Sequence, residues 1–310
     1  MIHTTLSYST FENFCRLFLK ETGMRFGNEK HYLLHQRLQP LLELFNFAHF
    51  EELFFQADTK NTEVLRACIN AVTTTETFFF RDSHPFAVFK DIILPELGDC
   101  IVKRKTGTHI RKGAKVSIWS AASATGQEPY SLAMLVSDFV EASCGKYTPD
   151  QFEICASDIN NAALTKAVSG KYTEFEVSRG LPIEMRDRYL FRTNREWLIS
   201  EKICRMVTFR EQNLAAGLMD MQGFDCIFCR NVLVYFDPAI RISILNDLCR
   251  LLSPGGTLFL GAAENILSVP FTGRECLITV DAGRTAFYRK QIKSSESGIC
   301  MNFTADNPVQ

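Results

Sequence analysis

The stretch VSIWSAASATGQEPYSLAMLVSD, residues 116–138, decides the fold class of this chain. It begins as an apolar β-type run, passes through a turn of small residues that includes Gly126, and continues as a helix opening on Glu128 and Pro129. Such a turn brings backbone N–H groups close to a nucleotide-like ligand. The second and third glycines of the dinucleotide fingerprint are absent, so a nicotinamide dinucleotide is not the natural ligand.

The segments that follow predict a doubly wound α/β sheet. Further apolar runs of strand length occur at residues 152–157, 206–209, 224–228 and 257–260. A helix pattern fills residues 239–252, and after the stop Ser-Pro-Gly-Gly we expect residues 257–260 to form the last strand. Strands that alternate with helices form a mostly parallel sheet, whose ligand lies across the carboxyl ends of the first strands.

Asp158 comes directly after the run at residues 152–157, 32 residues beyond Gly126. An acidic side chain at this place in a nucleotide-binding sheet can accept hydrogen bonds from a ribose diol. The alternative role is an N-cap for the helix expected to start near Asn161.

The 310 residues exceed one average domain, and 46% apolar residues suffice for a packed core. Residues 5 to about 70 follow a 3.6-residue period, with Phe11, Phe14, Leu17 and Phe18 on one face. We therefore expect a helical domain over residues 1–72. The remaining parts are a linker, a sheet domain and an aperiodic tail expected to be disordered, over residues 73–97, 98–290 and 291–310.

Charge and hydropathy exclude several classes of function. Lys and Arg number 34 against 35 Asp and Glu, so no overall basic field favours a nucleic-acid partner. Charges interrupt every apolar stretch well short of about 18 residues, and the N-terminus lacks a signal pattern. We expect a cytoplasmic protein without membrane insertion.

The 11 cysteines are scattered, most of them in apolar segments, as buried free thiols of a cytosolic protein would be. Cys226 and Cys229 lie in an expected strand, where side chains three residues apart point to opposite faces. No second pair stands at zinc spacing, so we expect no metal site.

Five spaced segments make the chain recognisable: TTTETFFFRD (73–82), WSAASATGQEPYSLA (119–133), ASDIN (156–160), FCRNVLVYFD (228–237) and SPGGTLFLGAAEN (253–265). Together they resemble the CheR family of chemotaxis-receptor protein-glutamate O-methyltransferases, which use S-adenosylmethionine and release S-adenosylhomocysteine. The resemblance implies a Rossmann-like class I methyltransferase sheet and an N-terminal all-helical domain. It also implies a small antiparallel β-subdomain inserted over residues 171–205.

The resemblance further implies which residues contact the cofactor. In the linker they are Thr75, Thr77 and Arg81, and a cation with hydroxyls suits the methionine carboxylate. The family usually has Asn where this chain has Thr75, so a hydroxyl replaces an amide there. The other residues matched to cofactor contacts are Glu128 near the amino group, Asp158 at the ribose, Asn213 and Leu214 beside the adenine, and Arg230 and Asn231.

The implied reaction needs no general base. A glutamate carboxylate, with an ordinary pKa of about 4.3, is ionised at neutral pH, and a sulfonium is a good leaving group. Catalysis should consist mostly of aligning oxygen, methyl carbon and sulfur and of desolvating the anion. Tyr235 and Arg81 are the candidate catalytic residues, and Tyr235 is expected over the methyl group, where it would steer the substrate carboxylate.

The implied partner is the cytoplasmic domain of a methyl-accepting chemotaxis receptor. In the family a basic face of the helical domain is thought to meet it, and the corresponding side chains here are Lys30, His31, His35 and Arg37. The alternative is an ordinary solvated face, because residues 1–80 hold seven Lys or Arg against nine Asp or Glu. A second basic cluster, between Lys103 and Lys115, fits either an acidic partner or a solvated loop.

The expected β-subdomain contains strand candidates at residues 172–177, 189–193 and 197–200. In some family members it captures a pentapeptide at the receptor's C-terminus by adding a strand to its edge. Other members lack this peptide-binding function, and the sequence of residues 171–205 is compatible with members of either kind.

Two other functions fit the same motifs. One is an S-adenosylmethionine methyltransferase acting on another protein or on a small carboxylic acid, although a small-molecule enzyme needs neither the helical domain nor the insert. The other is a non-catalytic signalling module that binds S-adenosylmethionine. Thr75, and Ala263 where the family usually has Ser, are the departures that favour it.

Overall fold

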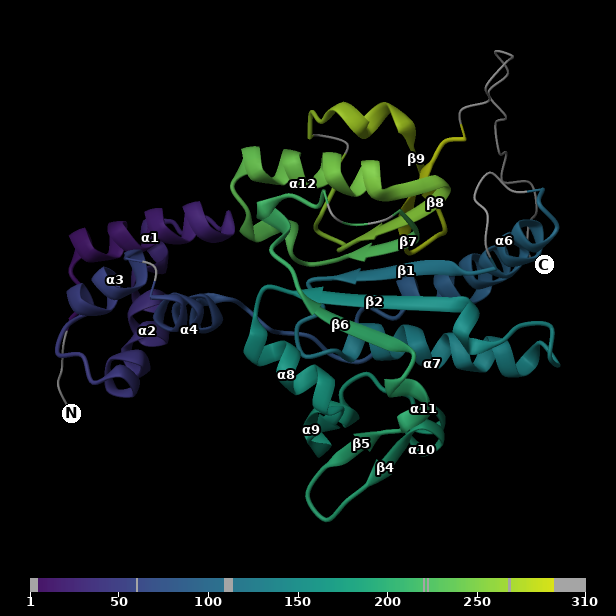
Figure 1. Cartoon of the computed structure of the whole chain (residues 1–310), viewed down its shortest axis with the longest axis horizontal. Helices are drawn as coiled ribbons and strands as arrows, with labels where there is room; N and C mark the ends of the chain where they lie inside the picture. The colour runs from purple at the N-terminus through teal and green to yellow at the C-terminus, as the bar shows by residue number, and fades with distance from the viewer. Residues whose placement is uncertain are drawn as a thin grey trace.

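The computed structural model describes residues 5–59, 61–108, 114–219, 221, 223–266 and 269–292. A helical unit stands at one end, and a twisted sheet covered by helices forms the rest (Figure 1). The predicted fold class is confirmed. Of the expected disordered tail, all but Gln291 and Ile292 lies outside the described residues. Within the described ranges, no helix combines the length and apolar character needed to cross a bilayer.

The helical domain contains α1 (Tyr8–Thr22), α2 (His31–Phe45), α3 (Phe50–Asp58) and α4 (Thr62–Val72). Helix α1 begins after Ser7, whose hydroxyl accepts a hydrogen bond from the Thr10 N–H, and it ends at Gly23, which has a φ of 72°. The apolar face predicted for this helix is confirmed, because all four of its side chains are buried: Phe11, Phe14, Leu17 and Phe18.

The main sheet has seven strands in the order β6-β2-β1-β7-β8-β10-β9. Five run parallel: β1 (Val116–Ala121), β2 (Phe152–Asp158), β6 (Val207–Glu211), β7 (Phe224–Cys229) and β8 (Leu252–Leu260). The order reverses between β1 and β7, and a ligand is expected at the carboxyl ends of the strands there. The helical domain stands at the end toward which β1 and β2 point (Figure 1).

Three long helices cover the two faces of the sheet. Helices α7 (Gln127–Ala142) and α8 (Asn161–Ser169) lie on one side, and α12 (Pro238–Leu251) lies on the other (Figure 1). The sheet separates two apolar cores, and Cys226 and Cys229 lie in different ones, as predicted from their spacing. The core beneath α12 also contains the buried side chains of the helical domain, so the two domains share one apolar core.

The main sheet contains two strands that were not predicted from the sequence. Strands β9 (Leu277–Asp281) and β10 (Ala286–Lys290) form an antiparallel hairpin next to β8, so the expectation that residues 257–260 form the last strand is wrong. Strand β8 also begins at Leu252, before the predicted start at residue 257, and its register with β7 shifts between Phe224 and Cys226. The β9 sequence LITVD is rich in strand-forming residues, although every residue of this strand is exposed or half-buried.

The inserted subdomain is a three-stranded antiparallel sheet in the order β3-β5-β4. Strands β4 (Leu190–Arg192) and β5 (Trp197–Ile199) confirm two of the predicted strands, and the short helices α10 (Ile183–Tyr189) and α11 (Glu201–Cys204) flank them. Residues 172–177 are mostly not a strand, because β3 (Lys171–Tyr172) gives way to helix α9 (Glu174–Ser178). Thr173 and Glu176 start that helix by bonding each other's backbone N–H groups.

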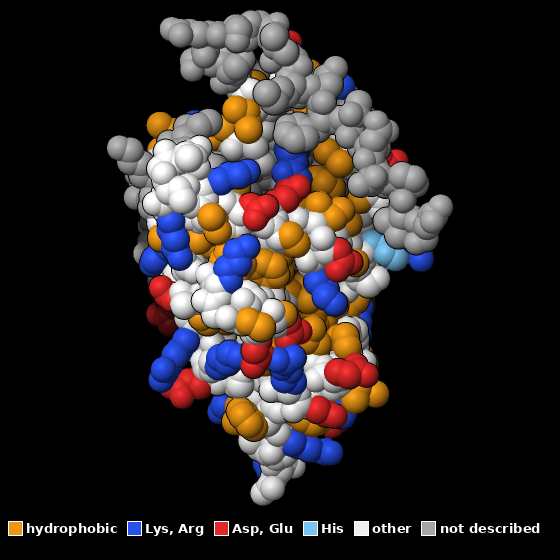
Figure 2. Space-filling view, turned by 90° about the vertical axis from the view of Figure 1, so that its right-hand side faces the viewer, with side chains coloured by type: hydrophobic (Ala, Val, Ile, Leu, Met, Phe, Trp, Pro, Cys, Tyr) orange, Lys and Arg blue, Asp and Glu red, His pale blue; other side chains and the backbone are white. Residues whose placement is uncertain are grey.

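Between α4 and β1, helical structure begins at His84, within the segment predicted to be a linker over residues 73–97. Helix α5 (His84–Val88), a π-helical turn (Phe89–Ile93) and α6 (Leu94–Lys105) follow one another without a break. The expectation of a solvated basic loop between Lys103 and Lys115 is therefore wrong in part, because its first cations belong to the last turn of α6. Arg111 and Lys112 lie outside the described residues. On the face seen in Figure 2, basic and acidic side chains are interspersed.

Arg104 departs most from the expectation of a solvated cation. Its guanidinium is buried and donates to both carboxylate oxygens of Asp225, with 3.1 Å between Nη1 and Oδ2, and to the Lys115 carbonyl. Asp225 also accepts from the Ser117 N–H at 2.9 Å. This pair therefore joins α6, β1 and β7 at the amino ends of the two strands.

Replacing Asp225 with Ala should destabilise the fold strongly, because it leaves the Arg104 guanidinium buried without its counter-charge. Removing one partner of a buried pair typically costs about 3–5 kcal/mol. We expect a lower urea midpoint with an unchanged slope. Glu153→Ala is the control, because it breaks an exposed pair with Lys115 and should change the midpoint little. Equal midpoints for the two variants would contradict a structural role for the buried pair.

Candidate active site

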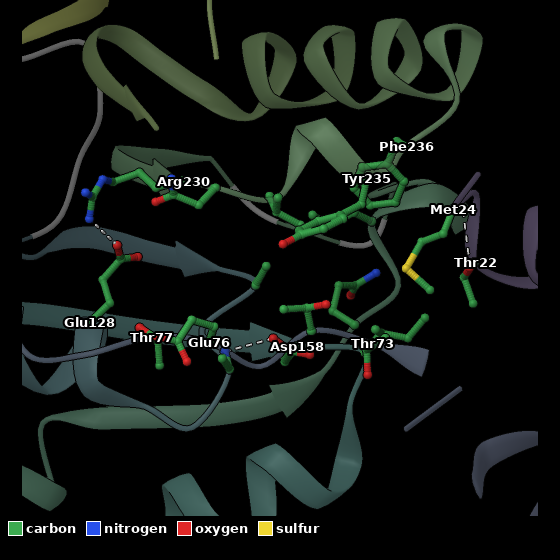
Figure 3. Close-up of a pocket in the computed structure, with 18 of the residues that line it drawn as sticks. Thr22, Met24, Thr73, Glu76, Thr77, Glu128, Asp158, Arg230, Tyr235 and Phe236 are labelled. Carbon is green, nitrogen blue, oxygen red and sulfur yellow. Dashed lines mark hydrogen bonds and ion pairs between the residues drawn. The ribbon is translucent and has the colours of Figure 1, made fainter. Parts of the chain in front are cut away.

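One pocket collects almost all the residues assigned to the cofactor. It lies at the carboxyl ends of β1, β2 and β7, beside the helical domain (Figure 3). Every candidate site residue except Thr75 lines it: Thr77, Arg81, Glu128, Asp158, Asn213, Leu214, Arg230, Asn231 and Tyr235. The fold thus brings together side chains that are far apart in the sequence.

The small-residue turn after β1 forms one wall of this pocket. Ala122, Ala124 and Gly126 have positive φ values of 57°, 48° and 92°, which glycine adopts readily and which are uncommon for residues with a Cβ. A Cβ on Gly126 would lie 2.8 Å from the Cβ of Ala167 in α8. Glycine therefore lets α7 begin close to α8 and places Glu128 in the pocket wall.

Asp158 ends β2 with a largely buried carboxylate. Its two oxygens accept from the N–H groups of Ala124 and Asn160, each at 2.8 Å. Burial raises the pKa of this carboxyl, and the N–H donors act against that rise. The N-cap of α8 is Asn160, whose side-chain oxygen accepts from the Ala163 N–H, so Asp158 does not have the alternative capping role.

Arg230 joins three segments of the pocket wall through a buried guanidinium. It donates to Glu128 at 2.8 Å, to the Asp82 carboxylate at 2.7 Å, and to the Arg81 carbonyl at 2.9 Å. Glu128 also accepts from the Ser120 hydroxyl at 2.8 Å. One guanidinium between two carboxylates leaves a net charge of −1 on these three side chains.

The linker crosses the pocket with its side chains on different sides. Thr77 and Arg81 line the pocket, and the Arg81 guanidinium donates to the Glu76 carbonyl at 2.8 Å. Thr75 instead lines an adjoining pocket, next to Lys166 and Arg179. The structure therefore does not bring Thr75 to the other candidate residues, although Thr77, two residues further on, lines both pockets.

Asn213 and Leu214 follow β6 at the rim near the helical domain. The Asn213 amide donates to the Glu21 carbonyl of α1 at 2.7 Å, and its oxygen caps a 3₁₀ turn by accepting from Ala215. Leu214 is buried against the shared core. This pair is thus held by contacts with both domains.

Tyr235 ends a 3₁₀ turn (Leu233–Tyr235) after β7, and its side chain is 41% exposed at the pocket. In Figure 3 it lies across the pocket from Asp158. The buried Glu264 carboxylate holds the start of this loop, because it accepts from the N–H groups of Asn231, Leu233 and Gly261 at 2.7–2.8 Å. Glu264 lies in one of the recognised segments, 253–265, but the motif alone does not indicate this role.

Ala263, the residue that departs from the family pattern beside Glu264, is exposed and does not line the pocket. The pocket also includes two residues that no motif indicates, Thr22 at the end of α1 and Met24 in the turn after it. No signal in the sequence connects them with the site, because only the docking of the helical domain brings them there. Among the described residues, no cluster of His, Cys, Asp or Glu is arranged to hold a metal ion.

A mostly parallel sheet with a pocket at its switch point and an acid at the end of β2 fits a nucleotide-like cofactor. Residues 75–278 match the family described as "CheR methyltransferase, SAM binding domain", and residues 9–73 match "CheR methyltransferase, all-alpha domain". The family match shows that the chain is an S-adenosylmethionine-dependent methyltransferase. The chain belongs to the CheR methyltransferase family and is a protein-glutamate O-methyltransferase.

Named relatives are similar over most of their length. Chemotaxis protein methyltransferase 1 of Pseudomonas aeruginosa is 37% identical over 84% of this chain and 91% of its own. Chemotaxis protein methyltransferase 1 of Vibrio cholerae is 35% identical over 86% and 92%. The chemotaxis protein methyltransferase of Escherichia coli is 32% identical over 84% and 85%.

A solved magnesium protoporphyrin IX methyltransferase from Synechocystis with bound S-adenosylmethionine covers 75% of this chain and 92% of its own. Its identity is 12% and its TM-score 0.33, too low to support an argument.

Asp158→Ala should abolish binding of S-adenosylhomocysteine in a calorimetric titration, because it removes the acceptor expected for the ribose hydroxyls. Asp150→Ala, an exposed carboxylate before the other end of β2, is the matched control and should bind like the parent. Loss of binding in both variants, or in neither, would contradict the assignment.

The affinity for S-adenosylhomocysteine should also depend on pH through Asp158. The pKa of its carboxyl is raised above 3.8 by burial, so the side chain becomes protonated at a higher pH than an ordinary Asp. A protonated carboxyl is a poorer acceptor, and we expect the affinity to fall as the pH is lowered through this raised pKa. Titrations with Asp158→Asn, which cannot ionise, should lack this step.

Proposed function

We propose that this pocket is where the chain, acting in the cytoplasm, transfers a methyl group from S-adenosylmethionine to glutamate side chains of a chemotaxis receptor. The product is a glutamate methyl ester in the receptor's cytoplasmic domain. The observation that carries the proposal is the convergence of the motif residues of a CheR methyltransferase on one pocket that the helical domain borders.

The pocket's chemistry fits S-adenosylmethionine. The charged residues that line the pocket are the acids Glu76, Glu128 and Asp158 and the cations Arg81 and Arg230, and their net negative charge suits a ligand that carries a sulfonium and an amino cation. Among the residues that the structure describes, the buried side-chain oxygen of Asn231 has no hydrogen-bond partner, and a ligand donor would satisfy it. The Asp158 oxygens each accept one N–H, which leaves capacity for ribose hydroxyls.

The other candidate residues that line the pocket are proposed to contact different parts of the cofactor. Glu128 is proposed to meet the amino group, Thr77 and Arg81 the methionine carboxylate, and Asn213 with Leu214 the adenine. Thr75 is not included among these contacts, because its side chain lines the adjoining pocket.

When bound, S-adenosylmethionine supplies an activated methyl group on a positively charged sulfur. A carboxylate oxygen of the substrate would form the new C–O bond as the C–S bond breaks, and the electron pair of that bond would stay on sulfur. Because the substrate glutamate is already ionised, the protein need only place it. We propose that the Tyr235 hydroxyl holds the carboxylate in line and that Arg81 orients the methionine end.

Receptor docking on the basic face of α2 has less support than the sequence suggests. Arg37 donates to the carbonyls of Val72 and Thr73 at 2.7 and 3.1 Å, which ties α2 to the linker. The His31 ring lies 2.9 Å from the Leu6 carbonyl. These two side chains therefore stabilise the helical domain and its junction, and the proposed docking face is less basic without them.

The inserted sheet offers a second place for the receptor. Strand β4 lies at its edge, with Phe191 63% exposed. An extended peptide could pair with such an edge, and its side chains would contact the exposed ring. We include binding of the receptor's C-terminal peptide at β4 as part of the proposal.

The test is transfer of labelled methyl groups to a purified receptor cytoplasmic fragment. Incorporation as base-labile esters supports the proposal. Binding of S-adenosylhomocysteine without transfer would favour a non-catalytic module, and transfer only to other proteins or carboxylic acids would assign a different substrate.

Tyr235→Phe should lower kcat in this assay by about 10- to 100-fold, because it removes the hydroxyl that orients the substrate carboxylate. Affinity for S-adenosylhomocysteine should stay within about threefold, since the ring remains. Tyr32→Phe, whose side chain is 74% exposed on α2, is the matched control. An unchanged kcat in Tyr235→Phe would remove this hydroxyl from the mechanism.

A further inference from the structure

The loop that carries Tyr235 is held from two directions. At its start, the Glu264 carboxylate binds the N–H groups of Asn231 and Leu233, and both contacts lie within the sheet domain. At its end, the backbone partners come from the helical domain. The Arg25 N–H donates to the Tyr235 carbonyl at 3.0 Å, and the Asp237 N–H donates to the Gly23 carbonyl at 3.0 Å.

These two bonds form a short antiparallel bridge in which Met24 lies opposite Phe236. Arg25 and Asp237 also approach as an exposed ion pair with 4.0 Å between Nη1 and Oδ2. Met24 lines the same pocket as Tyr235 (Figure 3). The turn after α1 therefore contacts the Tyr235 loop through backbone and side chain.

The turn has little freedom to move relative to this loop. Gly23 ends α1 with a φ of 72°, and a Cβ at this position would lie 2.7 Å from Ala215 and from Ile240 and 3.3 Å from the Phe236 ring. Glycine is thus required both by the conformation and by the close approach. A close fit of this kind transmits a displacement of the turn to the loop.

We propose that the turn Gly23–Arg25 is a positioning element of the active site, which sets the orientation of Tyr235 toward the substrate carboxylate. The inference rests on the catalytic role proposed for Tyr235. It gives the helical domain a part in the chemical step, separate from any part in receptor docking. Misplacing a catalytic group by a small distance lowers the rate more than it lowers the affinity for a ligand held elsewhere.

The test uses the full chain and Arg25→Pro, which removes the N–H that donates to the Tyr235 carbonyl. Arg25→Ala is the reference, because it keeps the N–H and measures the loss of the exposed side chain alone. Both substitutions are made in the parent chain and in Tyr235→Phe. For every variant we measure kcat for receptor methylation and the dissociation constant for S-adenosylhomocysteine.

Relative to Arg25→Ala, we expect Arg25→Pro to lower kcat by at least about fivefold, with less than about a threefold change in the dissociation constant. In the Tyr235→Phe background the same change should lower kcat by less than about twofold, because the hydroxyl that the turn positions is already gone. A merely structural role would lower kcat equally in both backgrounds.

Equal losses in both backgrounds, or no loss in either, would overturn the proposal. If the single variant Tyr235→Phe has the same kcat as the parent, the catalytic role proposed for Tyr235 fails. That result is distinct from a failure of the positioning role of the turn. If Arg25→Pro does not fold, Gly23→Ala takes its place in the same cycle. Its control is Gly283→Ala, which has a similar φ of 76° but no atom within 4 Å of the added Cβ.

Discussion

The buried guanidinium of Arg230 is the contact on which the arrangement of this site depends. It is 2% exposed and links the end of β7 to Glu128 at the start of α7 and to Asp82 in the linker. A buried cation without partners would be strongly unfavourable, so these three segments must meet for the fold to be stable. The same requirement closes the wall of the pocket and leaves it with the negative charge that suits a cationic cofactor.

The helical domain is fastened to the loops that form the site. Asn160, two residues after Asp158, donates to the Asn70 carbonyl at 3.0 Å and to the Thr73 hydroxyl at 2.7 Å. Asn213 bonds Glu21, and the Tyr235 loop bonds the turn after α1. The loops after β2, β6 and β7 therefore each have a partner in the helical domain or the linker. Docking of this domain and formation of the pocket are parts of one event.

Much of the fold and most of the site could be predicted because their signals are local. The first strand and its turn, the face of α1, and the opposite orientation of Cys226 and Cys229 follow from periodicity and residue size. The errors arise where a local signal is weak or misleading. A capping box starts helix α9 within a run that looks like a strand in the sequence. Arg104 resembles a solvated cation until its burial beside Asp225 is known.

The sequence by itself determined the class of sheet and the family, and all of its candidate site residues except Thr75 line the pocket. The motifs of a cofactor site lie at strand ends, and the order of these ends is visible along the chain. Tertiary structure alone decided that Thr75 faces away and that Glu264 holds the Tyr235 loop. It also decided that Met24 lines the pocket. These features depend on how segments without a shared periodicity approach in space, and backbone hydrogen bonds between them leave no pattern in the order of residues.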